Sequence, residues 1–179
     1  FPTNRVVRGL EGFDADALAA SCADAFDVAP LPADADGEAL LAAAAQKGET
    51  AFVFYAGKDK AWLLTLRDAA GVDAACPGAC AAYKELDVTR LHSLILEKRL
   101  GIDKENMAAQ INLTYTRSIE EAKALVDRGE ANGAFLINAT RVSQIRAVAA
   151  AGEKMPQKST YFYPKLITGL VMNRLDDKE

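Results

Sequence analysis

Gly133-Ala134-Phe135-Leu136-Ile137 is a short, continuously apolar run with turn residues on both sides. This composition is typical of a strand that is buried on both faces of a sheet. An earlier β-rich run lies at residues 111–116, and between the two runs Ser118-Ile119-Glu120-Glu121 has the pattern of a capping box that begins a helix. The order strand, helix, strand therefore starts at residue 111.

The same pattern continues beyond this run. We expect Thr140 to cap a further helix that ends near Gly152, and residues 166–175 predict a final strand. A βαβαβ succession is typical of parallel strands joined by right-handed crossovers. We therefore predict an α/β fold in which residues 87–179 form a mixed or mostly parallel sheet with helices on its faces.

The N-terminal part predicts a second small α/β unit, over residues 1–68. Two β-rich runs joined by a turn that contains Gly57 predict a hairpin, and two Ala-rich segments predict helices. These runs are residues 50–55 and 61–66, and the segments are residues 14–26 and 37–47. Residues 69–86 are weakly patterned, so we expect a linker or a long loop there. Residues 87–100 then predict an amphipathic helix, with His92 beside its apolar stripe.

Composition limits the classes of function. The chain has 179 residues and a net charge of −4, which argues against nucleic-acid binding because such proteins usually carry a basic patch. No apolar run approaches the length of a membrane helix, so we expect no membrane partner. Three cysteines and a single histidine favour free thiols in a reducing compartment and leave a zinc site short of ligands, so no metal site is predicted. The start at Phe1 suggests a piece of a longer protein.

The candidate site is the segment Met155-Pro156-Gln157-Lys158-Ser159-Thr160-Tyr161-Phe162-Tyr163-Pro164-Lys165, which contains no acid. The two prolines predict a stiff, extended conformation. Cations and hydroxyl donors at this density suit an anionic oxygen such as phosphate or carboxylate. The candidate anion-binding residues are Lys158, Ser159, Thr160, Tyr161, Tyr163 and Lys165. The alternative is an edge-strand connection whose tyrosines pack and whose lysines stay in solvent.

Two predicted helix starts provide further candidates. Tyr115-Thr116-Arg117-Ser118 and Asn138-Ala139-Thr140-Arg141 each combine a hydroxyl cap with an arginine, and a helix N-terminus favours an anion. Ordinary helix capping accounts for these residues by itself and is the alternative to ligand binding. His92 on its helix is more often structural than catalytic. The chain contains no phosphate-binding glycine motif and no nucleophile elbow, so P-loop kinases and such hydrolases are disfavoured.

The candidate segment, followed by Thr168-Gly169-Leu170-Val171, resembles the C-terminal signature of an uncharacterised prokaryotic family, domain of unknown function 1015. Residues 87–102 resemble that family's central helix, and Pro2-Thr3-Asn4-Arg5 resembles its Pro-Thr-His-Arg segment, with Asn4 in place of histidine. The resemblance implies a longer cytoplasmic protein. Its N-terminal half carries a motif similar to the phosphate-contacting motif of ParB, sulfiredoxin and free-serine-kinase-like proteins, which implies handling of a nucleotide or a phosphoryl group.

Two functions from different classes follow. In the first, Lys158, Ser159, Thr160 and Tyr161, with Arg5 and His92, contribute to an anion site that the N-terminal half completes, and a nucleotide is the ligand that the family implies. In the second, the chain is a structural or interaction module that docks its own N-terminal half or a second copy in a homodimer. No catalytic residue is assigned, and enzymatic activity stays open.

Overall fold

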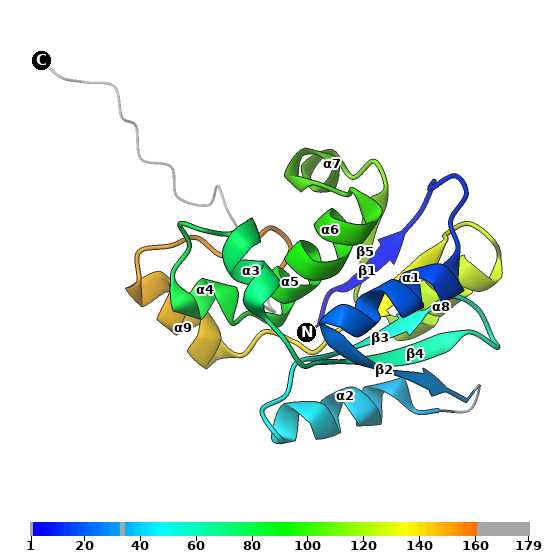
Figure 1. Cartoon of the computed structure of the whole chain (residues 1–179), viewed down its shortest axis with the longest axis horizontal. Helices are drawn as coiled ribbons and strands as arrows, with labels where there is room; N and C mark the ends of the chain where they lie inside the picture. The colour runs from blue at the N-terminus through cyan, green and yellow to red at the C-terminus, as the bar shows by residue number, and fades with distance from the viewer. Residues whose placement is uncertain (1, 33–34, 161–179) are drawn as a thin grey trace, which may run out of the picture.

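The computed structural model describes residues 2–32 and 35–160. Their centre is one sheet in which neighbouring strands run antiparallel, in the order β2-β4-β3-β6-β1-β5 (Figure 1). The strands are β1 (Asn4–Val7), β2 (Phe26–Leu31), β3 (Ala51–Tyr55), β4 (Ala61–Leu66), β5 (Leu113–Thr116) and β6 (Gly133–Leu136). The predicted hairpin is confirmed, since β3 pairs with β4.

Helices cover both faces of the sheet. The helical elements are α1 (Ala15–Ser21), η1 (Cys22–Asp24), α2 (Gly37–Gln46), α3 (Ala70–Ala75), α4 (Ala81–Lys84), α5 (Asp87–Leu91), η2 (His92–Glu97), α6 (Lys98–Leu100), α7 (Lys104–Ala109), α8 (Ile119–Asp127) and α9 (Val142–Ala150). The alternation of a strand sends successive side chains to opposite faces. Phe54 and Phe135 therefore pack with α1, η2 and α7, whereas Val53 and Leu136 pack with α2 and α8. The core is thus two apolar layers on either side of one sheet.

The α/β class is confirmed, but the mixed or mostly parallel sheet that we predicted is wrong, because every pair of neighbouring strands in the described part of the chain is antiparallel. Strands β5 and β6 run in the same direction, as a β-helix-β unit requires, yet they are not neighbours. The N-terminal strand β1 lies between them and pairs antiparallel with both, so that Val6 stands opposite Thr114 on one side and Ala134 on the other. A buried, continuously apolar strand indicates cover on both faces, and it does not indicate which strand lies beside it.

The two expected units, residues 1–68 and 87–179, contribute strands to the same sheet, because β6 pairs with both β3 and β1. Residues 69–86, where we expected a linker or a long loop, contain the short helices α3 and α4. The expected helix over residues 14–26 ends earlier, because Phe26 already begins β2. The expected final strand at residues 166–175 lies outside the described residues.

The helix predicted at residues 87–100 is present as α5, η2 and α6 in direct succession, and it ends at Gly101, whose φ of 65° closes the helix. Its middle part, η2, is π-helical. Arg90 binds this helix to the sheet, since its Nη1 donates to Thr50 Oγ1 at 2.6 Å, and Thr50 in turn donates to Asp87 Oδ1 at 2.7 Å. The helix is therefore fixed against the start of β3.

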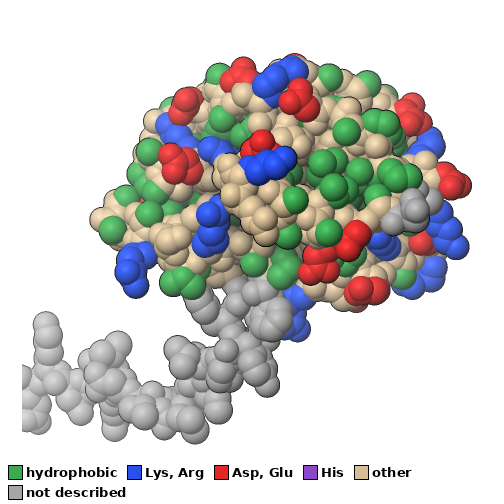
Figure 2. All heavy atoms as spheres, turned by 90° about the horizontal axis from the view of Figure 1, so that it is seen from below, with side chains coloured by type: hydrophobic (Ala, Val, Ile, Leu, Met, Phe, Trp, Pro, Cys, Tyr) green, Lys and Arg blue, Asp and Glu red, His purple; other side chains and the backbone are tan. Residues whose placement is uncertain are grey.

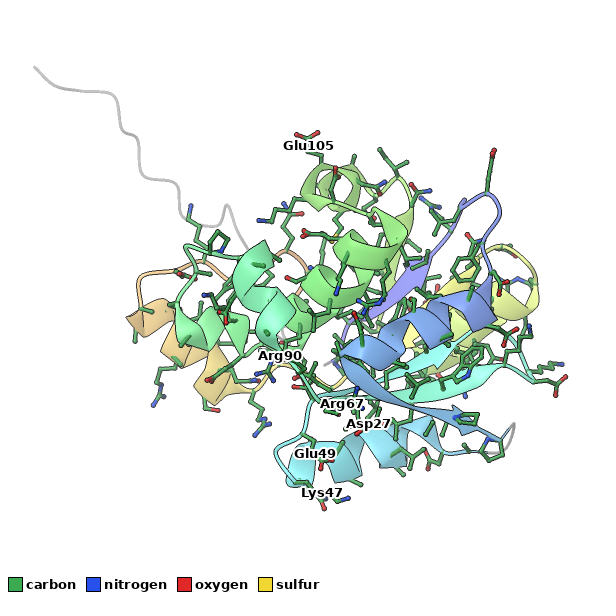
Figure 3. The ribbon with its side chains drawn as sticks, in the orientation of Figure 1. Asp27, Lys47, Glu49, Arg67, Arg90 and Glu105 are labelled. Atoms are coloured by element: carbon green, nitrogen blue, oxygen red, sulfur yellow. The ribbon has the colours of Figure 1, made fainter. Side chains whose placement is uncertain are left out.

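Ion pairs on the surface join neighbouring elements. Arg67, just after β4, lies beside Asp27 of β2, with 3.0 Å between Nη1 and Oδ1 (Figure 3). Seen from below, basic and acidic side chains are interspersed over the face in view (Figure 2). Among the residues described, no helix combines the length and the apolar character that crossing a membrane requires.

Candidate functional site

Two hollows meet at Tyr115, near the end of β5, and its side chain lines both. The first, called here the cationic hollow, has a volume of about 580 Å³. Its lining consists of Thr3, Tyr115, Thr116, Arg117, Ser118, Glu121, Lys158 and Thr160. The second, called here the His92 cavity, has a volume of about 320 Å³ and is enclosed by parts of α4, α5, η2, α7 and β5 together with residues 154–157.

The described part of the candidate segment, residues 155–160, contains a turn and is not the extended ribbon that we expected. Ser159 N donates to Pro156 O at 3.3 Å, its hydroxyl donates to the same oxygen at 2.6 Å, and Lys158 has a φ of 55°. Pro156 restricts only itself and the residue before it, so the chain is free to turn after it. The Ser159 hydroxyl is therefore used within the segment, and its side chain is buried.

Lys158 is exposed and lines the cationic hollow together with the half-buried Thr160. No carboxylate among the described residues forms an ion pair with its amine. Its own carbonyl accepts a hydrogen bond from Arg5 Nη2 at 3.3 Å, which holds the backbone of the turn. Three further predicted site residues, Tyr161, Tyr163 and Lys165, lie outside the described residues.

The start of α8 also lines the cationic hollow, through Arg117, Ser118 and Glu121. Ser118 caps the helix as predicted, because its hydroxyl accepts from Glu121 N at 3.0 Å. The other half of the capping box differs: Thr116 Oγ1 accepts from Ser118 N at 3.2 Å and donates to the Glu121 carboxylate. Arg117 lies between these residues and lines the hollow with Lys158. The structure thus brings the first predicted corner and the Lys158 segment together.

The second predicted corner lies elsewhere. Arg141, not Thr140 as we expected, is the residue at the cap of α9, and its backbone N donates to Gln144 Oε1 at 2.9 Å. Thr140 instead donates its hydroxyl to Ser159 O at 2.9 Å and so supports the turn. The exposed Arg141 is part of the lining of neither hollow.

Arg5 of β1 is completely buried behind the turn. Its Nε donates to His92 Nε2 at 3.3 Å, its Nη1 donates to Thr3 O, and its guanidinium carbon lies 5.5 Å from the centre of the Tyr115 ring. No carboxylate in the described ranges pairs with it. Burial lowers the pKa of Arg5 to about 10, and the nearby Tyr115 opposes this shift, so the side chain stays charged at neutral pH.

His92 lies at the start of η2 and is partly exposed to the cavity named after it. Burial, and then the charge of Arg5, lower its pKa to about 3. The imidazole is therefore neutral at neutral pH, and because Nε2 accepts from Arg5 the ring proton is on Nδ1. Such a histidine donates a hydrogen bond, but it is poorly suited to exchange protons near neutrality.

Several lining residues were missed by the sequence reasoning. Thr3 lines the cationic hollow, and no local pattern connects it with a lysine that follows it by more than a hundred residues. Thr89 and Ser93 line the His92 cavity, and their spacing with His92 on one side of a helix was a signal that could have found them. The predicted residues that do come together are Arg5, His92, Arg117, Lys158 and Thr160.

Residues 1–89 match the model of a family described as "Protein of unknown function (DUF1015)". The match covers β1 to β4 and ends at Thr89, so the resemblance of residues 155–171 lies outside it and stays a prediction. A solved structure of a conserved hypothetical protein from Pyrococcus furiosus is 19% identical, with a TM-score of 0.46 over 90% of this chain. This chain spans 54% of that protein's length. No curated protein matches the chain.

Proposed function

We propose that this chain contributes an anion-binding surface, the cationic hollow, to a site that handles a nucleotide or a phosphoryl group. In this proposal an N-terminal half outside the chain completes the site. The observation that carries it is the exposed amine of Lys158, which no carboxylate of the described residues neutralises and which shares the hollow with Arg117 at the start of α8. A compact ammonium at a helix N-terminus suits phosphate oxygens.

The surrounding groups support an anion on the Lys158 side of the hollow. Thr3 and Thr160 also line the hollow, and each has a hydroxyl that can donate a hydrogen bond. The Glu121 carboxylate also lines the hollow, but the Thr116 hydroxyl donates to it and holds it at the end of β5. In this arrangement the anion binds away from Glu121, because like charges repel at short range.

Arg5 and His92 act as positioning residues in this proposal. Arg5 holds the Lys158 carbonyl and thereby the turn that presents the amine. His92 supports Arg5 through the hydrogen bond to Nε, and its low pKa makes it a poor acid or base near neutrality. The role proposed for this chain is therefore binding and orientation, and no proton-transfer step is assigned to its residues.

The test is a titration of the chain with inorganic phosphate, followed by backbone amide NMR. We expect the signals of Lys158, Thr160 and Ser118 to shift, and Lys158→Ala to abolish these shifts while the free energy of unfolding stays within about 0.5 kcal/mol. Lys47→Ala is the matched control, because Lys47 is an exposed lysine at the end of α2 (Figure 3). Shifts that persist in Lys158→Ala refute the proposal.

The same experiment addresses the alternative, a structural or interaction module. In that case phosphate leaves the signals of Lys158 and Thr160 unmoved, whereas addition of the N-terminal half, or an increase in the concentration of the chain itself, broadens them. Broadening on addition of the N-terminal half indicates docking within a longer protein. Broadening at a higher concentration of the chain itself indicates a homodimer.

A further inference from the structure

The His92 cavity has a volume of about 320 Å³, at the lower end of the range of about 300 to 1,000 Å³ that small-molecule sites occupy. Among the described residues, Tyr115 is the one that it shares with the lining of the cationic hollow. Three of its lining residues, His92, Ser93 and Glu97, belong to η2, and π-helical turns inside helices occur frequently at functional sites. The cavity is therefore a candidate for a small ligand of its own.

Arg5 lies against two residues of this cavity's lining. Its Nε donates to His92 Nε2 at 3.3 Å, and its guanidinium carbon lies 5.5 Å from the centre of the Tyr115 ring. The side chain is fully buried, and the other acceptors of its hydrogen bonds are the uncharged carbonyls of Thr3 and Lys158. A buried cation without an opposite charge is costly. An anion bound in the cavity supplies such a charge close to Arg5 and offsets part of this cost.

His92 presents a hydrogen-bond donor that a ligand can reach. Because Nε2 accepts from Arg5, the proton of the neutral ring is on Nδ1, which has no partner among the described residues. Nδ1 is also absent from the unpaired polar atoms that have less than 1 Å² of accessible surface in the described part of the chain, so it is accessible. Since the ring lines the His92 cavity, a ligand reaches this donor there. A donor on a ring that a cation polarises suits an anionic acceptor.

The charged side chains of the lining also favour an anion. Lys104, Lys154 and Glu97 line the cavity, and no carboxylate of the described residues forms an ion pair with either lysine. Burial raises the pKa of the Glu97 carboxyl, and the charge of Lys104 opposes this shift. Glu153 is not part of the lining, and its carboxylate accepts from Cys80 N. The lining thus has a net positive charge, whereas the chain as a whole has a net charge of −4.

The lining also includes side chains with apolar surface. Met107 and Met155 contribute thioethers and Tyr83 contributes an aromatic ring. Met155 packs against the buried apolar cluster that joins α5 to α9. An inorganic ion leaves this apolar surface without a partner, whereas an organic acid covers it. The Glu97 carboxylate repels a dianion more strongly than a monoanion, which favours a carboxylate over a phosphate.

From these observations we infer that the His92 cavity binds a small organic carboxylate, whose charged group accepts from the Nδ1–H of His92 and whose apolar body contacts the methionine and tyrosine side chains. The inference goes beyond the phosphate site and does not rest on it, because neither Lys158 nor an anion in the cationic hollow takes part. The ligand binds reversibly, and no covalent bond forms or breaks.

The experiment uses butyrate and benzoate, titrated singly into the full chain at about pH 7, where both acids are ionised. Butyramide and benzamide, which are uncharged and have nearly the same shapes, are the matched control probes. His92 is the only histidine, so its ring signals report on the cavity by NMR, together with the methyl signals of Met107 and Met155. We expect at least one carboxylate to shift these signals with a dissociation constant of about 1 mM or tighter, and its amide to bind at least about tenfold more weakly.

Two substitutions test the contacts of the carboxylate. We expect Lys154→Ala to weaken binding about threefold, the effect of one exposed charge. His92→Leu removes the donor, and we expect at least about tenfold weaker binding, the effect of a hydrogen bond to a charged group. Lys47→Ala is the matched control, because Lys47 is an exposed lysine outside the lining, and it leaves binding unchanged. Lys158→Ala also leaves binding unchanged, which separates this site from the cationic hollow.

The inference is overturned if neither carboxylate reaches this affinity, or if the amides bind as tightly as the carboxylates. It is also overturned if Lys154→Ala binds as tightly as the wild type, or if Lys158→Ala weakens binding as much as Lys154→Ala does. Circular dichroism shows whether His92→Leu folds. If this variant does not fold, the amides and Lys154→Ala decide the outcome.

Discussion

His92 is the only histidine of the chain, so its titration can be isolated by a single substitution. The pKa of an exposed histidine is 6.5, and in the folded protein burial and the charge of Arg5 lower it to about 3. Above pH 6.5 the imidazole is neutral in both the folded and the unfolded chain. Below this pH the unfolded chain takes up a proton that the folded chain does not, so the free energy of unfolding falls as the pH decreases.

The size of this loss follows from the two pKa values. Between about pH 7 and about pH 5 the unfolded histidine becomes almost fully protonated and the folded one stays neutral, which lowers the free energy of unfolding by at most about 2 kcal/mol. This is an upper limit, because His92 is partly exposed to its cavity and water there reduces the shift. The loss continues until the pH reaches the folded pKa of about 3.

The assay is urea unfolding, followed by circular dichroism, at about pH 7 and about pH 5 for the wild type and for His92→Gln. Glutamine does not titrate, and its side-chain oxygen is able to accept from Arg5 Nε. Burial raises the pKa values of Asp87 and Glu97, but these carboxyl groups are present in both proteins and cancel in the comparison. We expect the wild type to lose up to about 2 kcal/mol more than the variant over this interval. An equal loss in both proteins refutes a neutral, desolvated His92 in the folded state.

Two further predictions concern the pairing of β3 with β6. Phe54→Ala removes a ring that stacks on Phe135 at 4.9 Å and on Trp62 at 5.3 Å between centroids, so we expect a loss of about 3–5 kcal/mol in urea unfolding. Phe54→Leu, which fills more of the same space, loses clearly less. Gly133→Ala places a methyl group 2.8 Å from Phe54 Cε2 and 3.3 Å from Tyr55 O, and we expect a loss of about 1–3 kcal/mol by the same method. Wild-type stability of Gly133→Ala contradicts this close approach of the two strands.

Local sequence patterns predicted the helices and strands of this fold better than they predicted which strands lie side by side. The hairpin of β3 and β4 is visible in the sequence because its two runs and its turn are adjacent. The burial of β6 on both faces is likewise confirmed, with Phe135 in one apolar layer and Leu136 in the other. The parallel arrangement was wrong because the strands beside β6 are β1 and β3, which both run antiparallel to it, and the pairing of Val6 with Ala134 leaves no trace in either local pattern.

The candidate site was likewise predicted only in part from the sequence. The sequence singled out Lys158 in an acid-free segment rich in hydroxyls and Arg117 at a predicted helix start, and both residues line one hollow. The turn at Lys158 was not predictable from the prolines, because it depends on the Ser159 hydroxyl returning to Pro156 O and on the distant Arg5 holding the Lys158 carbonyl. Thr89 was missed because an unpaired hydroxyl is a property of its surroundings, and a threonine in a helix looks the same in sequence with or without a partner.

The position of β1 has a consequence for how the protein is made. Residues 4–7 leave the ribosome before both of their partners, β5 and β6, which follow more than a hundred residues later. Contacts so distant along the chain slow folding, and exposed strand edges favour aggregation. During synthesis both edges of β1 therefore stay unpaired until its partner strands have been made. The pairing of β1 with β6 is complete only when residue 136 has left the ribosome.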